Sequence, residues 1–189
     1  MVTIAHRARL ARARGASMIE VLVTIVILAV GLMGVAGLQG RLQVSELEGY
    51  QRAQAMILLD DMAYRFAANR NFAADYVTTA ATPTGYGVVC PVAVTTMEQK
   101  DMRDWCLALQ GAGEKTGATN VGTMIGGRGC VEALANNEYL ITVAWQGTGP
   151  VSAPPASVAC GANQYDGAGC TNDRCRRVVT TIVKIAPLI

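Results

Sequence analysis

The sequence has almost none of the residues that enzymes use to transfer protons or to bind metals. Its only histidine is His6, so the chain beyond residue 15 has no imidazole for a Ser–His or Cys–His pair. No glycine-rich stretch follows a strand pattern and opens a helix, which excludes a phosphate-binding loop. Asp60 and Asp61 are adjacent on a helical pattern, where consecutive side chains do not face each other. We therefore predict that the protein is not an enzyme and takes no cofactor.

Cysteine is missing from the first 89 residues. The six cysteines then follow at Cys90, Cys106, Cys130, Cys160, Cys170 and Cys175. An even number in a glycine-rich, polar region indicates disulfides in an oxidising compartment, the alternative being reduced, buried thiols in the cytosol. A zinc site is disfavoured, because zinc ligands usually come in close pairs and no Cys-x-x-Cys occurs. Among the possible pairings we favour Cys160 with Cys175, which would close the loop directly before the last strand pattern.

Charge of either sign is missing from Val21 to Leu38. This run approaches the roughly 20 apolar residues of a membrane-spanning helix. Four arginines and no acidic residue precede Gly15, and Glu20 stands at the edge of the run. Basic segments stay on the cytoplasmic side, so the chain after about residue 40 would lie outside the cytoplasm. Beyond residue 15 the chain has 12 of its 16 basic residues against all 14 acidic ones, a near balance that gives no argument for nucleic-acid binding.

Proline is missing until Pro83, and the pattern predicts one long helix over residues 16 to about 68. Its first half is apolar on all sides. Its second half is amphipathic, with an apolar stripe at Leu59, Met62, Ala63 and Phe66, and must pack on a folded domain. Glycine recurs every third residue from Gly31 to Gly40. Such glycines either let neighbouring helices approach closely or mark a place where the helix unwinds, and the pattern leaves both open.

The remaining chain predicts a small domain with helix and sheet. Residues 72–95 read as irregular chain and residues 97–110 as a short amphipathic helix, with Asp101 among its outward-facing charges. Strict alternation predicts a strand over 138–146, with a partner strand over 177–185 and a third, weaker strand around 124–134. Trp105 and Trp145 are expected in the core and Tyr165 on the surface. The fold class is therefore α+β, with the distal half of the long helix packed on a small antiparallel sheet.

One basic cluster stands near the end of the chain, formed by Arg174, Arg176, Arg177 and Lys184. Contact with DNA is the functional interpretation, and an edge strand protected by charge is the alternative. No aromatic residue is interleaved with these positions, so base stacking has no support. We predict that the protein does not bind nucleic acid.

The segment Gly15-Ala16-Ser17-Met18-Ile19-Glu20, with the uncharged run behind it, resembles the class III signal of type IV prepilins and pseudopilins. The match covers residues 12 to about 40, and the layout of the rest also fits. Within this superfamily, residues 15–23, Met33-Gly34 and the Cys-Arg-Arg-Val-Val run at 175–179 are most similar to PilV-type minor pilins of Gram-negative type IV pili.

The resemblance implies a leader, residues 1–15, that prepilin peptidase would cut between Gly15 and Ala16. The new amine of Ala16 would be N-methylated. Ala16 departs from the phenylalanine usual in major pilins, and Gly37 lies near the place of their mid-helix proline. Residues 16–40 would form the membrane-spanning and filament-core helix, and residues 41–189 the external domain, including the amphipathic half of the helix. The implied fold is the type IV pilin fold with a disulfide-bonded C-terminal loop.

The cost of placing a charge in a membrane predicts a role for Glu20 in subunit pairing. An ionised carboxylate costs about 2.5–3.5 kcal/mol at the centre of a bilayer, so it needs a partner there. The cationic amine of Ala16 on a neighbouring subunit would be that partner and would set the axial register of assembly.

The implied function is that of a minor pilin, which helps to prime type IV pilus assembly in the inner membrane and lies at or near the tip, supporting motility and adhesion. The implied partners are other minor pilins and the major pilin, prepilin peptidase, the inner-membrane assembly platform and a tip adhesin. A pseudopilin of type II secretion and a membrane-anchored periplasmic binding module are the alternatives. The protein would first be held in the inner membrane, with its C-terminal domain in the periplasm, and later lie in the pilus at the cell surface.

Overall fold

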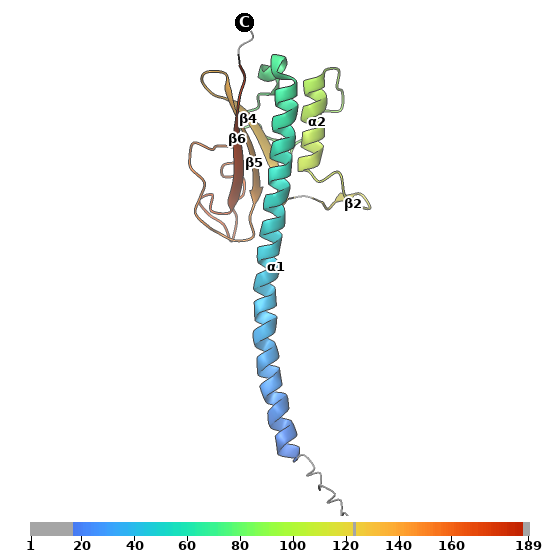
Figure 1. Ribbon diagram of the computed structural model, residues 1–189, viewed down its shortest axis with the longest axis vertical. Helices are drawn as coiled ribbons and strands as arrows, with labels where there is room; N and C mark the ends of the chain where they lie inside the picture. The colour runs from blue at the N-terminus through green and yellow to red at the C-terminus, as the bar shows by residue number, and fades with distance from the viewer. Residues whose placement is uncertain (1–16, 123, 187–189) are drawn as a thin grey trace, which may run out of the picture. The chain divides into compact units, whose positions relative to one another are not determined.

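The structure, a computed structural model, describes residues 17–122 and 124–186 (Figure 1). The chain divides into two units, one ending at Gln43 and one beginning at Val44. Helix α1, Met18–Ala68, belongs to both, so the predicted long helix is confirmed from Met18 onward. Ala16 and the leader lie outside the described residues.

The second unit contains a four-stranded antiparallel sheet in the order β1-β4-β5-β6. Its strands are β1 (Thr84–Gly85), β4 (Arg128–Ala133), β5 (Glu138–Gln146) and β6 (Arg176–Lys184). A short 3-10 helix, η1 (Arg70–Tyr76), follows α1, and a second α-helix, α2, spans Met97–Leu109. Strands β2 (Lys115–Thr116) and β3 (Thr119–Asn120) form a separate hairpin. The two predicted strands, the third strand and the short helix are confirmed, whereas η1 and β1 form within a region expected to be irregular.

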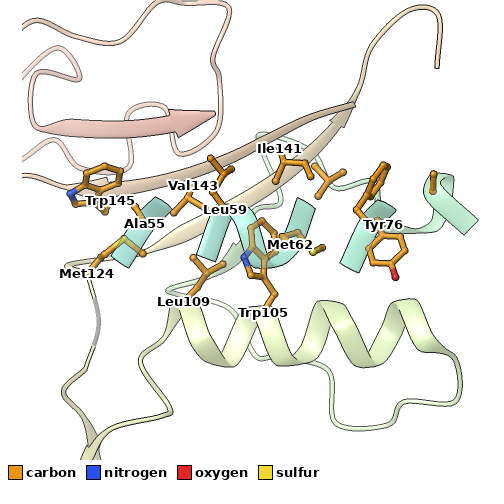
Figure 2. Packing of buried hydrophobic residues seen from close by; sticks show 13 residues of the cluster. Ala55, Leu59, Met62, Tyr76, Trp105, Leu109, Met124, Ile141, Val143 and Trp145 are labelled. Atoms are coloured by element: carbon orange, nitrogen blue, oxygen red, sulfur yellow. The ribbon is translucent and has the colours of Figure 1, made fainter. Parts of the chain in front are cut away.

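Two helices cover one face of the sheet, and the core lies between them and the strands (Figure 2). The apolar stripe of α1 supplies Leu59, Met62 and Phe66, all buried as predicted. Trp105 of α2 is fully buried, donates its indole N–H to the Leu58 carbonyl at 2.9 Å and faces Gly129 of β4. This one side chain therefore joins α2, α1 and the sheet. Strand β5 adds every second residue, Tyr139, Ile141, Val143 and Trp145, to the same core.

The opposite face of the sheet is covered by the long segment between β5 and β6. Ala144 of β5 packs there with Tyr165 and with the disulfide between Cys130 and Cys160. Tyr165 is only 4% exposed, so the prediction that it lies on the surface is wrong. The cause is the loop itself, which folds back over the sheet and carries Tyr165 beneath it.

All six cysteines form disulfides, namely Cys90–Cys106, Cys130–Cys160 and Cys170–Cys175. The favoured pairing of Cys160 with Cys175 is therefore wrong. Cys160 lies over the sheet and is joined to Cys130 on β4, so the loop is fixed to the sheet rather than closed on itself. Cys175 closes a tight turn with Cys170, five residues earlier, directly before β6.

Asp101 also differs from its prediction. It was expected among the outward-facing charges of the short helix, but it is only 6% exposed. Its carboxylate is buried because Arg65 of α1 and Tyr76 of η1 both donate hydrogen bonds to it. A charge can be buried when such partners satisfy it.

Candidate functional site

The first unit holds the predicted assembly residues. Gly15 and Ala16 lie outside the described residues, so the structure places neither of them. Glu20 lies in the first turn of α1, where its backbone N–H donates to the Ser17 carbonyl at 3.0 Å. Its side chain is exposed and has no hydrogen bond or ion pair to any residue in the described part of the chain. Glu20 is thus a lone carboxylate at the start of an apolar helix.

The helix behind Glu20 exposes apolar side chains on every side. All residues from Met18 to Gln43 are exposed, and the most apolar 18-residue window has a mean hydropathy of 2.7. Leu22, Leu28 and Leu32 are each more than 60% exposed, so nothing in the first unit buries this surface. Within the described residues α1 is the one helix long and apolar enough to cross a membrane.

The four glycines spaced every third residue, from Gly31 to Gly40, lie within continuous α-helix. A Cβ added at any of them would meet no atom within 4 Å. The isolated chain therefore gives no packing reason for glycine at these positions. The helix is continuous through all four glycines in the isolated chain, and both alternatives left open by the sequence stay open.

In the second unit, α1 is tied to the sheet by Glu48. Its Oε1 accepts hydrogen bonds from the Thr148 backbone N–H at 2.6 Å and hydroxyl at 2.7 Å, and lies 3.4 Å from Nη2 of Arg177. Burial opposes ionisation of Glu48, but the Thr148 hydrogen bonds and the Arg177 charge outweigh it, and the pKa of Glu48 is lowered. The carboxylate therefore stays charged and joins α1 to β6.

A second polar network joins the end of α1 to α2. Arg65 bridges Asp61 at 2.9 Å and Asp101 at 3.0 Å. The Tyr76 hydroxyl donates to Asp101 at 2.6 Å and accepts from Asn69 at 3.0 Å. Burial first, and then the hydrogen bond to Asp101, raise the pKa of Tyr76 to about 12. This network satisfies its buried charges internally, which is the pattern of a structural rather than a reactive cluster.

Arg128, the one basic residue of β4, is largely enclosed by other side chains. Its guanidinium carbon lies 5.2 Å from the ring centre of Tyr86 and 4.9 Å from that of Tyr165. It is only 8% exposed, and its Nη1 donates to the Gly126 carbonyl at 3.3 Å. Two cation–π contacts of this kind stabilise a desolvated arginine, so Arg128 holds the loop over the sheet. No sequence pattern indicates this site, because Tyr86, Arg128 and Tyr165 are far apart in the chain.

The predicted basic cluster does not form one positive surface. Arg176 is buried and pairs with Asp173 at 2.6 Å, and Arg177 reaches Glu48. Lys184 pairs with Glu138 at 3.0 Å. Acidic partners therefore neutralise three of its four cations within the described residues. This arrangement leaves no continuous basic stripe of the kind that follows a phosphate backbone.

Three buried side chains, one on α1 and two on β5, have polar atoms without a partner among residues 17–122 and 124–186. These atoms are Gln51 Oε1, Thr142 Oγ1 and Trp145 Nε1. A fourth is Glu132 Oε2 on β4, where burial raises the pKa of the carboxyl. In the same described part, no group of three or more His, Cys, Asp or Glu side chains could hold a metal ion.

Comparisons with protein-family models, with curated proteins and with solved structures found no match to this sequence.

Proposed function

We propose that the protein is a minor pilin, a structural subunit that helps to prime type IV pilus assembly and lies at or near the pilus tip. The observation that carries the proposal is the position of Glu20. It is the one charge in the first turns of a helix that is apolar on all sides, and it follows the Gly15-Ala16 signal directly. An ordinary membrane anchor does not need a carboxylate there.

In this proposal α1 is both a temporary anchor and an assembly surface. After cleavage, the apolar turns hold the subunit in the inner membrane through the helix alone. An unpaired carboxylate in that setting costs at most about 2.5–3.5 kcal/mol, the value for the centre of a bilayer. The methylated amine of Ala16 on a neighbouring subunit supplies the opposite charge, so Glu20 favours entry into the filament at one axial register.

The open glycine positions fit the same role. Because Gly31, Gly34, Gly37 and Gly40 lack a Cβ, helices of neighbouring subunits can approach closely at these positions, as small residues permit in membrane helix pairs. The second unit then supplies the external domain, and its three disulfides fit an oxidising compartment such as the periplasm and the cell surface.

Mass spectrometry of the N-terminus of the protein purified from its native membrane tests the proposal. We expect a chain that begins at Ala16 and carries one methyl group on its amine. A chain that retains residues 1–15 would overturn the proposal and favour a membrane-anchored periplasmic binding module. A pseudopilin of type II secretion would show the same processing, and genes for a secretion system beside its own gene would identify that alternative.

A matched pair of variants tests the role of Glu20. We expect Glu20→Ala to remain in the membrane and to be depleted at least ten-fold from purified filaments. Glu46→Ala, which removes another exposed carboxylate from the same helix, serves as the control and should assemble normally. Normal incorporation of Glu20→Ala would refute the register role.

A further inference from the structure

Strand β6 is an edge of the sheet, and its outer side carries backbone groups that nothing in the described chain uses. It pairs with β5 on one side only, over nine residues. The two bonds that flank this pair, from the Gly147 N–H to the Cys175 carbonyl at 2.8 Å and from the Ile185 N–H to the Asn137 carbonyl at 2.9 Å, continue its register and both involve odd-numbered residues beside β6. Hydrogen bonds alternate along an antiparallel pair.

This alternation directs the backbone groups of Val178, Thr180 and Ile182 away from β5. No residue in the described part of the chain hydrogen-bonds to them. Proteins usually shorten, bulge or cover such an edge, because an unpaired strand is a template for another strand. Here the edge is long and regular, and Ile182 is 59% exposed beside it.

A groove runs between this edge and α1, which lie side by side in the second unit (Figure 1). It has a volume of about 420 Å³ and is lined on the strand side by residues 178–181. The α1 side contributes one helix face, formed by Arg52, Met56, Leu59 and Asp60. Met56 is 48% exposed, so the middle of the groove is apolar and open.

The two ends of the groove carry opposite charges without partners. Neither Arg52 nor Asp60 forms an ion pair with any residue among those the structure describes, and both are exposed. They are eight residues apart on α1, which corresponds to about 12 Å along the helix. An extended strand covers that distance in about four residues, and residues four apart lie on the same face of a strand.

Arg52 also lines a second cavity of about 340 Å³, together with Trp145 and with Glu48 and Arg177, which pair with each other. Trp145 is 2% exposed, and its indole Nε1 has no acceptor in the described chain. A free cation and an unused N–H donor thus occur at the same end, which favours a carboxylate there.

A second copy of β6 does not match this groove. The residues of β6 that face α1 are Arg177, Val179, Thr181 and Val183, which include no carboxylate for Arg52. The other edge strand, β1, is only two residues long. The charge pattern therefore favours a different polypeptide.

We propose that the groove between α1 and β6 binds an extended segment of a partner protein, which extends the sheet as an additional strand beside β6. Three alternate side chains of this partner segment face the groove. An acidic one pairs with Arg52, an apolar one packs on Met56 and a basic one pairs with Asp60. Backbone hydrogen bonds to Val178, Thr180 and Ile182 supply affinity, and the side chains supply specificity. The inference concerns the second unit alone and does not depend on the proposed role in pilus assembly.

The test uses the full-length chain in detergent micelles and two labelled peptides, Thr-Lys-Thr-Val-Thr-Glu-Thr and Thr-Glu-Thr-Val-Thr-Lys-Thr, which match antiparallel and parallel addition to β6. Fluorescence anisotropy should show that one of them binds at least ten-fold more tightly than Thr-Gln-Thr-Val-Thr-Gln-Thr. The double variant Arg52→Glu with Asp60→Arg exchanges the two charges and should reverse the preference between the charged peptides. Failure of both charged peptides to bind, or an unchanged preference in this variant, would overturn the proposal.

A backbone test separates strand addition from simple charge attraction. Thr180→Pro removes an outward N–H from an edge strand, where proline is tolerated, and should weaken binding at least ten-fold. Thr180→Ala keeps that N–H and should bind like the wild type. Equal binding by both variants would contradict strand addition, as would cross-linking of two copies of this chain through β6.

If Thr180→Pro does not fold, N-methylated peptides give the same information. Alternate peptide N–H groups of an added strand point toward β6, and the others point away. Methylation of the first set should abolish binding, whereas methylation of the second set should be tolerated. Equal effects of the two sets would overturn the proposal.

Discussion

At the scale of single residues, the hydroxyl of Tyr76 joins three elements of the second unit. It lies in η1, donates to Asp101 of α2 and accepts from Asn69 directly after α1. We predict that Tyr76→Phe lowers the free energy of unfolding by about 1–3 kcal/mol, because Asp101 loses a donor while it stays buried. Denaturant titration followed by tryptophan fluorescence measures this. Tyr64→Phe is the control, since Tyr64 is 77% exposed, and an equal effect of the two changes would contradict the prediction.

The same residue predicts an alkaline loss of stability. The pKa of Tyr76 is raised from 10.0 to about 12, so the folded state favours the neutral phenol. This contribution is complete below pH 10 and is lost progressively as the pH rises toward 12, because the unfolded chain releases that proton first. Thermal unfolding measured from pH 8 to 12 should show a steeper decline in the wild type than in Tyr76→Phe. Parallel curves would show that Tyr76 titrates normally.

Gly129 of β4 is required by contact with Trp105. A Cβ at this position would overlap the indole ring, which is itself fully buried and fixed by its bond to Leu58. We predict that Gly129→Ala lowers the free energy of unfolding by about 1–3 kcal/mol through overpacking. Gly113→Ala is the matched control, since its Cβ would meet no atom within 4 Å. Similar stability of the two variants would show that Trp105 moves aside without cost.

At the scale of elements, the disulfides join irregular segments to α2 and to β4 and close the turn before β6. The Cys130–Cys160 bond links β4 to the long segment that precedes β6, and its two cysteines are 30 residues apart in the chain. The two cysteines of the Cys170–Cys175 bond are only five residues apart. Loop-closure entropy then predicts a loss of about 3.6 kcal/mol when the first bond is removed and about 2 kcal/mol for the second. Double Cys→Ala variants compared by chemical denaturation test this order, and a reversed order would contradict it.

Two elements show that sequence patterns can predict which side of a helix or strand is buried. The stripe of Leu59, Met62 and Phe66 and the alternation of β5 predict which sides are buried, because each pattern repeats with the period of its own helix or strand. Asp101 is an exception, because it is buried although the pattern predicts an exposed side chain. Its position on α2 indicates the surface, but Arg65 and Tyr76 approach it from elements up to 36 residues away.

At the scale of the whole molecule, the apolar first half of α1 predicts that the protein partitions into membranes. The full-length chain should sediment with membranes and be released by detergent but not by alkaline carbonate. Val30→Lys places a charge near the middle of the run, which costs about 2.5–3.5 kcal/mol, and should shift much of the protein into the soluble fraction. Gln43→Lys, after the run, is the control and should leave the distribution unchanged. Wild-type protein that is wholly soluble would contradict the prediction.

The sequence by itself determined the long helix, the strands β5 and β6, the apolar stripe of α1 and the isolated position of Glu20. These features depend on periodicity, on the length of an uncharged run and on the absence of proline, which are properties of neighbouring residues. Only the tertiary structure decided that Cys160 joins Cys130, that Tyr165 lies under the loop and that Asp101 is buried. It also revealed the open edge of β6 beside Arg52 and Asp60. Each of these depends on which distant segments meet, and local patterns do not specify that.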